Sequence, residues 1–240
     1  MANFTFNGEI LYPSNTYNIS IDESETYNTP EKDYEFVEIP GRSGDLLFDN
    51  KRFKNMTISV PIFIRSNFGL YRNQLVRYLY SVDGYQKLTF PNDIGHYRMA
   101  AFYRAIEPET GSFNKSGHLT LEFNCKPQRF LNTGDNLVAV SSNTINNPTN
   151  FPAKPMIRFY GNGTFTMNGY TVTVSGRQAS QYIEIDCDLM TCSNNGTNLS
   201  SYVTLSNGYP ILKGGSNAVS WSSDSTLQYP LQMRPRWWEI

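Results

Sequence analysis

The dipeptide Asn168-Gly169, flanked on both sides by strand-forming residues, is the feature that most constrains the fold of this chain. An Asn-Gly pair readily adopts the positive φ values that a two-residue β-hairpin turn requires. The flanking segments 164–167 and 170–174 are rich in Thr, Phe, Val and Tyr, which favour strands. Further short strands are predicted at 156–160, 182–187, 202–205 and 218–221. Short strands at this spacing, with no helical period between them, predict a β-sandwich or jelly-roll in the C-terminal part of the chain.

The N-terminal part combines strands with one helix. Residues 57–64 and 118–125 alternate between apolar and polar side chains, which predicts two half-buried strands with His118 on the solvent side. Between them, apolar residues recur at steps of three and four from Phe68 to Val82, with Ser66 or Asn67 as the candidate N-cap. One helix among strands predicts a mainly β domain with a single helix packed on it.

Charge divides the chain into two parts. The first 136 residues hold 30 charged side chains (14 basic and 16 acidic), whereas the remaining 104 hold 11 (6 basic and 5 acidic). Turn-forming residues fill the segment 132–150, where this change occurs. We therefore predict two domains, residues 1–136 and 137–240. The net charge of −1 excludes a nucleic-acid binder that works by bulk electrostatics.

Composition also restricts location and cofactors. No apolar run reaches the roughly eighteen residues that a membrane helix needs, and the first residues lack the pattern of an export signal. The three cysteines, Cys125, Cys187 and Cys192, have no zinc spacing with either histidine, His96 or His118, and are expected to be buried thiols. The sequence predicts no cofactor and no metal.

Catalytic patterns are weak. Glu184 and Asp186 lie two residues apart on one strand, at roughly the 6–7 Å separation that inverting glycosidases use. On the polar outer face of such a strand, nothing apolar is expected to raise the pKa of either carboxyl, as a general acid requires. Asp188 adds a second carboxylate next to Asp186, but further spaced oxygen ligands for calcium are missing. We therefore expect no catalytic residues.

The C-terminal segment 231–238 has two distinct faces if it is extended. Leu231, Met233, Pro235 and Trp237 then share an apolar face, which predicts that Trp237 is buried. Trp238 lies on the opposite face with Arg236, where the two side chains either cover their own domain or contact a partner.

Several segments together resemble the distal tail proteins of long-tailed phages. The segment Pro40-Gly41-Arg42-Ser43-Gly44-Asp45-Leu46, followed by residues 53–60, is similar to the opening of that family. The strand 182–187, the turn Tyr209-Pro210-Ile211-Leu212-Lys213-Gly214-Gly215-Ser216-Asn217 and the ending Pro235-Arg236-Trp237-Trp238 are similar to its C-terminal part. The similarity covers nearly the whole chain in the same order.

The resemblance implies an N-terminal β-sandwich with one helix, known as a belt domain, and a C-terminal galectin-like β-sandwich. It implies a non-enzymatic virion protein at the tail tip, forming a homo-oligomeric ring of six copies between the tail tube protein and the tail-associated adhesin or lysin. Receptor-binding or baseplate proteins would attach to it, and neither a membrane nor a specific nucleic-acid sequence is an expected partner. Some relatives carry C-terminal insertions, and this chain has no spare length for one.

A ring requires surfaces that contact other copies. We expect such a contact near the loop Pro40, Gly41, Arg42, Ser43, Gly44 and Asp45 and the strand after it, and at Arg236 and Trp238. Pro210, Leu212, Gly214 and Asn217 are expected to form a structural turn. The acidic segment 22–38 is either a solvated loop or a surface that faces a subunit or the channel.

A carbohydrate-binding tail adhesin is the alternative function. Trp221 and Tyr209 could each stack on a sugar ring of the host cell-wall polysaccharide. A galectin-like fold alone does not establish sugar binding, because the site and not the scaffold confers function.

Overall fold

The computed structural model describes residues 3–21, 29–106, 109–110 and 115–240. The chain forms two compact units, unit 1 (residues 1–129 and Ile240) and unit 2 (residues 130–239). The sequence-based boundary after residue 136 remains a prediction about which parts fold independently.

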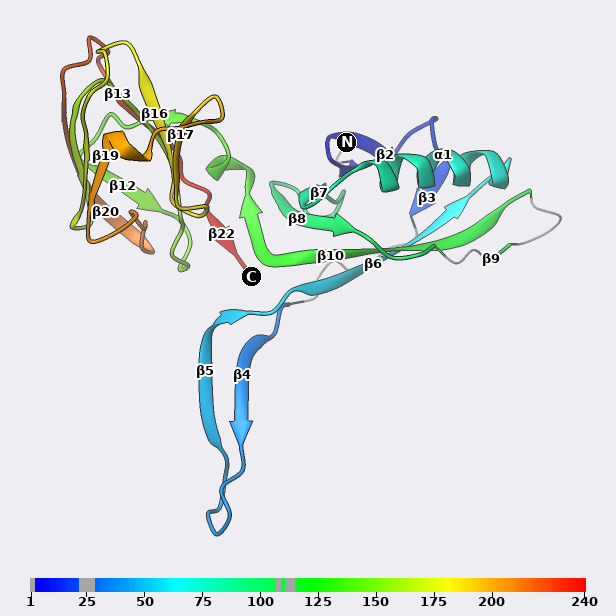
Figure 1. Ribbon diagram of the computed structural model, residues 1–240. Coiled ribbons are helices and arrows are strands. Elements are labelled where there is room, and N and C mark those ends of the chain that lie inside the picture. The colour runs from blue at the N-terminus through cyan, green and yellow to red at the C-terminus, as the bar shows by residue number, and fades with distance from the viewer. Residues whose placement is uncertain (1–2, 22–28, 107–108, 111–114) are drawn as a thin grey trace. The chain divides into compact units, whose positions relative to one another are not determined.

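Unit 1 is built on one curled antiparallel sheet (Figure 1). Its strands follow the order β2-β1-β7-β8-β10-β6-β3, and β9 pairs with β10. The first and last strands of this order, β2 and β3, approach each other, so the sheet is nearly closed. The strand bounds are β1 (Phe4–Phe6), β2 (Glu9–Tyr12), β3 (Ile19–Ile21), β6 (Met56–Ile64), β7 (Gln86–Thr89), β8 (His96–Phe102), β9 (Glu109–Thr110) and β10 (Gly117–Leu131).

The alternation in the sequence fixes which face of this sheet is buried. In β6, Ile58, Val60 and Ile62 are fully buried, and their neighbours in β10 on the same face, Leu121 and Phe123, are buried with them. His118 is exposed, as the pattern predicts, and its ring lies 4.7 Å from that of Phe63.

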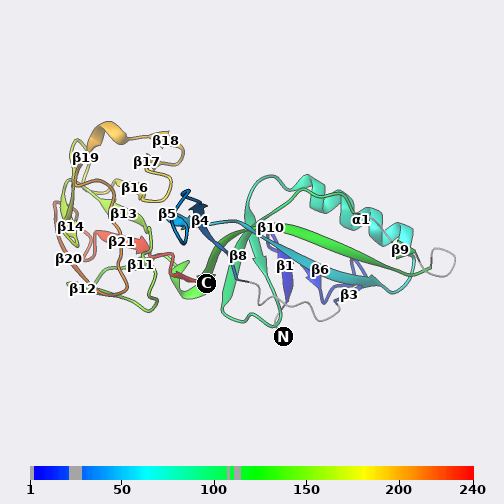
Figure 2. The same cartoon turned by 90° about the horizontal axis from the view of Figure 1, so that it is seen from below.

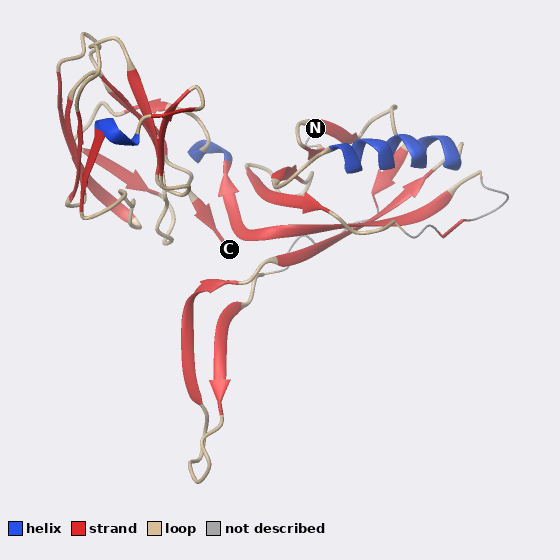
Figure 3. Cartoon of the chain, in the orientation of Figure 1, coloured by secondary structure: helices blue, strands red, loops and turns tan. Residues whose placement is uncertain are grey.

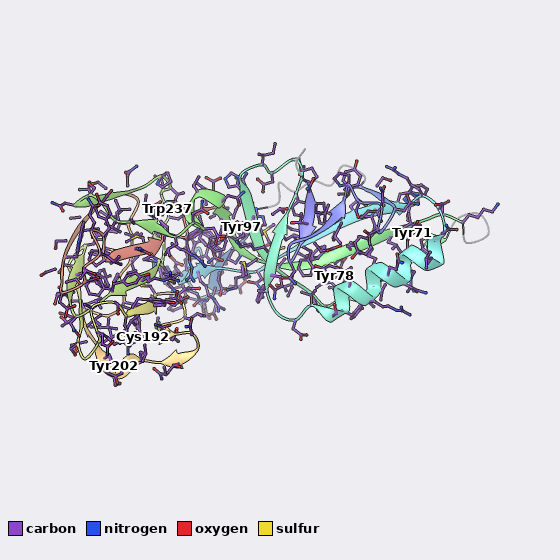
Figure 4. The ribbon with its side chains drawn as sticks, turned by 90° about the horizontal axis from the view of Figure 1, so that it is seen from above. Tyr71, Tyr78, Tyr97, Cys192, Tyr202 and Trp237 are labelled. Atoms are coloured by element: carbon purple, nitrogen blue, oxygen red, sulfur yellow. The ribbon has the colours of Figure 1, made fainter. Side chains whose placement is uncertain are left out.

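The helix α1 (Phe68–Ser81) covers the buried face of this sheet (Figures 1 and 2). Phe68, Leu75 and Leu79 are buried against the sheet, and Tyr71 and Tyr78, labelled in Figure 4, pack beside them. The predicted helix is therefore confirmed. The N-cap prediction is correct only in position: Asn67 adopts φ 48° and makes no side-chain capping hydrogen bond.

Two strands of unit 1 stand apart from this sheet. β4 (Lys32–Val37) and β5 (Leu46–Phe53) pair only with each other and form a two-stranded ladder of their own (Figure 1). We refer to residues 32–53 as the arm.

Unit 2 is a sandwich of two antiparallel sheets, with strands coloured red in Figure 3. One has the order β11-β21-β13-β16-β17-β18 and the other β12-β20-β14-β15-β19. The first sheet contains β11 (Val138–Ala139), β21 (Leu231–Arg234), β13 (Met156–Tyr160), β16 (Tyr182–Asp186), β17 (Thr191–Asn194) and β18 (Thr197–Asn198). The second contains β12 (Thr144–Asn147), β20 (Gly215–Ser223), β14 (Gly163–Met167), β15 (Tyr170–Val174) and β19 (Val203–Ser206). Two 3-10 turns, η2 (Asn132–Gly134) and η3 (Ser200–Tyr202), and the terminal strand β22 (Trp238–Glu239) complete the elements of this unit.

The Asn168-Gly169 hairpin is confirmed. It joins β14 to β15, and both residues have positive φ. Phe165 and Val172 face each other across this hairpin and are fully buried in the core between the two sheets. The mainly β fold class, with one α-helix among the described residues, is likewise confirmed.

The segment 132–150 is more ordered than the sequence predicts. The sequence indicates a linker there, but the segment contains the edge strands β11 and β12, which pair with β21 and β20. Their partners lie at least 68 residues further along the chain, so local turn propensity could not predict this pairing.

Candidate functional site

The arm exposes apolar side chains on both of its faces. Phe36 is 65% exposed and lies opposite Leu47, which is 49% exposed, on one face of the ladder. Phe48, 51% exposed, lies on the other face, as do Val37 and Leu46, which are opposite each other and also exposed. An isolated two-stranded hairpin is at best marginally stable in water, and contiguous exposed apolar surface of this kind marks interaction sites.

The two strands of the arm are joined at their base by an ion pair and a backbone hydrogen bond. Arg52 donates through Nε to Oδ2 of Asp33 at 2.6 Å, and this hydrogen bond lowers the pKa of Asp33. Next to it, the backbone N–H of Lys54 donates to the carbonyl of Glu31 at 2.8 Å. These two bonds hold the two strands of the arm together at its base.

The predicted contact loop forms the tip of this arm. Pro40, Gly41, Arg42, Ser43, Gly44 and Asp45 join β4 to β5 and are all exposed. Gly41 and Gly44 have φ values of 81° and 84°, a conformation that favours glycine. Of the acidic segment 22–38, Asp22, Glu23 and Glu25 lie outside the described residues.

The C-terminal segment has the two faces that its sequence predicts. Trp237 is buried in the core of unit 2 together with Leu231 and Met233 (Figure 4). Trp238 lies on the other face, where its ring packs 4.5 Å from that of Phe151 and its Nε1–H donates to the carbonyl of Pro152 at 2.9 Å. Trp238 is therefore engaged within its own unit.

Arg236 also has a partner in its own unit. Its guanidinium donates two parallel hydrogen bonds to the carboxylate of Asp186, at 2.8 and 2.7 Å. Arg236 adopts a φ of 58°, which is unusual for a side chain of this size. Unit 1 contains a similar pair, because Arg129 donates through Nε to both carboxylate oxygens of Asp93, at 3.0 and 3.1 Å.

The turn 210–217 is held by buried hydrogen bonds. Leu212 is fully buried, and its backbone exchanges two hydrogen bonds with Ala153. Asn217 is also fully buried. Its side-chain oxygen accepts hydrogen bonds from the backbone N–H of Lys213, at 2.7 Å, and from the side chain of Asn168. Its side-chain amide donates to the backbone carbonyls of residues 145, 213 and 215. A Cβ on Gly214 would lie only 2.9 Å from the carbonyl oxygen of Thr149, so a larger residue would require the backbone to shift. Pro210, at the start of the turn, is buried. The motif thus links the Asn168-Gly169 hairpin to the rest of unit 2.

The carboxylates considered for catalysis are both neutralised by arginine. Glu184 accepts from Arg158 at 2.6 Å, and Asp186 accepts from Arg236. Burial alone would raise the pKa of Asp186, but hydrogen bonds from Arg236 and from the backbone N–H groups of Leu189 and Asp188 outweigh it, so the pKa is lowered. A carboxyl held ionised in this way is a poor general acid.

The structure also bears on the cysteines, on metal binding and on membrane-spanning helices. Cys125, Cys187 and Cys192 are buried thiols, as predicted. Burial raises the pKa of Cys125 to about 12 and also raises those of Cys187 and Cys192. Across the described ranges, no group of three or more His, Cys, Asp or Glu side chains could hold a metal ion, and no helix is long and apolar enough to cross a membrane.

The exposed apolar side chains on both faces of the arm were not predicted from the sequence, which indicated only a contact near the loop 40–45 and the strand after it. Phe36 and Val37 are adjacent, as are Leu46, Leu47 and Phe48. Because neighbouring residues on a strand point to opposite faces, adjacent apolar residues in a strand require cover on both faces. These runs of adjacent apolar residues are the sequence signal from which the apolar arm could have been predicted.

No protein-family model and no curated protein matches this chain. Among solved structures, the crystal structure of SPP1 Dit (gp 19.1) matches 97% of this chain and 97% of its own length, with a TM-score of 0.70 and 13% sequence identity. This chain has the fold of SPP1 Dit. That protein is described as a paradigm of the hub adsorption apparatus in phages that infect Gram-positive bacteria. The resemblance to distal tail proteins, first indicated by the sequence, is thereby confirmed at the level of the fold.

Proposed function

We propose that this chain is a structural hub subunit of a phage tail tip and that it works by assembly and not by catalysis. Two observations support this: the fold of SPP1 Dit along the whole chain and an arm with apolar side chains on both faces. The arm carries the proposal, because its exposed apolar surface requires cover that the described residues of one chain do not provide.

Other copies of this chain are the proposed cover. Head-to-tail contacts between identical subunits close into a ring when the rotation between neighbours permits it. In the proposed ring of six copies, arm residues such as Phe36, Leu47 and Phe48 are buried against neighbouring subunits. The tip loop 40–45 lies in the same contact, and Arg236 and Trp238 extend the interface only where their intradomain partners leave surface accessible.

The proposed ring has three kinds of neighbour in the virion. It would join the tail tube protein on one side to the tail-associated adhesin or lysin on the other, and it would anchor receptor-binding or baseplate proteins. It would act in the virion tail tip after assembly in the bacterial host cytoplasm.

A matched pair of variants tests the arm contact. Leu47→Ser removes an apolar side chain from the arm, and Leu70→Ser makes the same change on α1, where Leu70 is 56% exposed. Light scattering after size-exclusion chromatography of the full chain should give a multiple of the subunit mass for the wild type and for Leu70→Ser. Leu47→Ser should dissociate at the same concentration, while its circular dichroism spectrum stays that of the folded protein. Equal assembly of both variants would overturn the arm contact, and a wild type that remains monomeric at every concentration would overturn the proposal.

Carbohydrate binding is not favoured by the side chains that would perform it. Trp221 and Tyr209 both pack against the core of unit 2, and the Tyr209 hydroxyl donates to the carbonyl of Met190 at 2.7 Å. Calorimetric titration of the full chain with host wall polysaccharide should therefore give no binding heat. A saturable signal that Trp221→Ala abolishes would support the alternative.

A further inference from the structure

Charge is unevenly distributed along unit 1. Residues 1–50 hold ten acidic and two basic side chains, whereas residues 51–129 hold twelve basic and five acidic ones. Charges of opposite sign on different parts of one subunit allow identical subunits to attract each other head to tail. A contact between copies of this kind would bring the acidic part of one unit 1 against the basic part of the next.

The acidic side chains of the distal arm, which we define as residues 35–48, are available to a partner. Acids at the base of the arm are already paired, Asp33 with Arg52 and Asp49 with Lys51. The three acids of the distal arm are exposed and have no basic partner among the described residues; they are Glu35, Glu38 and Asp45. The distal arm holds one base, so it combines a net negative charge with exposed apolar side chains.

The basic side chains that lack an acidic partner gather along α1. Elsewhere in residues 55–129, Arg98 is buried, Arg129 is bonded to Asp93, and two lysines lie over tyrosine rings. The helix itself contains no acidic residue. The bases without an acidic partner among the described residues are Arg72 and Arg77 on α1, and Arg65 and Lys115 at its start.

The C-terminal end of α1 adds exposed aromatic rings to this charge. Tyr80 is 53% exposed, and Tyr103, which follows β8, is 56% exposed. Arg77 precedes Tyr80 by about one helical turn, and the Tyr80 hydroxyl donates to the carbonyl of Arg104 at 3.0 Å. The guanidinium of Arg104 lies 5.9 Å from the centre of the Tyr103 ring. We refer to Arg77, Tyr80, Tyr103 and Arg104 as the Arg-Tyr face. Tyrosine and arginine are among the residue types that contribute most binding energy at protein interfaces.

The Arg-Tyr face is held in place and keeps a net positive charge. The Tyr80 ring packs edge-on against the buried Phe102, with 5.5 Å between ring centres. Arg104 pairs with Glu122 at 3.1 Å, which leaves the charge of Arg77 without an acid among the described residues. Side chains that are ordered before binding lose less conformational entropy when a partner docks. The face is therefore suited to a partner that carries both carboxylates and apolar side chains.

The distal arm carries both of these groups on one face of its ladder. Glu35 lies opposite Phe48, and Val37 lies opposite Leu46 on the same face. We propose that the distal arm of one copy of this chain docks on the Arg-Tyr face of a second copy. This inference rests on the proposed function, because it names the surface that receives the arm in the ring. Leu70 lies ten residues before Tyr80, roughly 15 Å along the helix, and is outside this contact.

Charge reversal on each side of the contact tests it in the full chain. The arm variant carries Glu35→Lys and Glu38→Lys, and the face variant carries Arg77→Glu and Arg104→Ser. Each variant places like charges on the two sides of the contact, so the concentration for half-maximal assembly should rise roughly tenfold or more. Light scattering measures assembly, and circular dichroism establishes that each variant is folded.

Mixing the two variants separates a contact between copies from one within a chain. In a ring where the two variants alternate, each reversed arm meets a reversed face and each native arm meets a native face. A ring of six copies permits this alternation. An equimolar mixture should therefore recover most of the tenfold loss, although neither variant assembles alone at that concentration. A contact between an arm and the face of its own chain cannot be restored by mixing.

The matched control makes the same charge change at the other end of α1. Arg65→Glu with Lys115→Ser alters the net charge of the chain as the face variant does, and both positions are exposed at the start of the helix. This control should assemble at the wild-type concentration.

The outcomes distinguish this contact from the proposed function. Loss of assembly in the arm and face variants, with recovery on mixing, supports the contact. Equal assembly of the face variant and its control overturns the contact, and so does a mixture that stays dissociated; in both cases an assembled wild type leaves the proposed function standing. A wild type that remains monomeric at every concentration overturns both.

Discussion

Two hairpins of this chain have the same local structure and opposite surroundings. The β14–β15 hairpin lies between β20 and β19, and its facing residues Phe165 and Val172 are fully buried. The arm has no third strand among the described residues, and its facing residues Phe36 and Leu47 are exposed. Both hairpins carry the apolar content of a covered strand, so the comparison indicates that the cover of the arm comes from outside the chain.

The comparison predicts a large difference between two phenylalanine truncations. Phe165→Ala leaves a cavity in the core of unit 2 and should lower the free energy of unfolding by about 3–5 kcal/mol. Phe36→Ala on the arm should change the stability of the monomer by less than about 1 kcal/mol, because the side chain is already in water. Urea unfolding at a concentration where the chain is monomeric measures both. Similar losses for the two variants would show that the arm is covered within one chain.

Removing a buried polar side chain in unit 2 should cause the next largest loss of stability. Asn217→Ala removes hydrogen bonds to the N–H of Lys213 and to the carbonyl of Ile145 inside the domain, which should cost about 3 kcal/mol. Asn207→Gly is the control, because Asn207 is exposed, donates to the carbonyl of Gly169 at 3.1 Å and has a φ of 69°, which glycine adopts without strain. Its effect should stay below about 1 kcal/mol. If thermal unfolding shows equal losses of stability for the two variants, the turn 210–217 does not hold the Asn168-Gly169 hairpin in place.

The Asp186–Arg236 pair predicts a dependence of stability on pH. The lowered pKa of Asp186 in the folded state means that its stabilisation is complete above the unfolded pKa of about 3.9 and is lost as the pH falls through the folded value. Asp186→Asn should cost about 2 kcal/mol at pH 7, because the charge-assisted hydrogen bonds weaken. The difference from the wild type should shrink as the pH falls below about 4. A difference that grows towards low pH would contradict the assignment.

The smallest expected effect is a gain in stability. Met190→Asn places a residue that tolerates the left-handed region at φ 55° and should stabilise the chain by up to about 1 kcal/mol. Differential scanning calorimetry of the wild type and the variant measures it. A lower melting temperature would show that the Met190 side chain contributes more to stability than its strained backbone conformation costs.

Local pattern predicts much of this fold. The alternation at Ile58, Val60 and Ile62, the period of α1 and the Asn168-Gly169 turn are all confirmed, because each depends on residues close in sequence. The burial of Trp237 and the outward position of Trp238 follow from strand alternation in the same way.

The features that could not be predicted depend on distant partners or on backbone strain. The strands β11 and β12 form only because β21 and β20 supply hydrogen-bond partners from far along the chain. The positive φ of Met190 and Arg236 contradicts residue preference and is imposed by tertiary contacts such as the Asp186–Arg236 pair. The exposure of the arm could not be predicted, because it depends on the absence of any further described strand that pairs with β4 or β5.

Hydrogen exchange at two protein concentrations tests the covered arm most directly. In the assembled wild type, the backbone amides of residues 46–53 should exchange slowly, and dilution to the monomer should make them exchange faster by at least tenfold, while the amides of β14 and β15 stay protected. Equal exchange of the arm at both concentrations, in a sample that light scattering shows to be assembled at the higher one, would contradict the account.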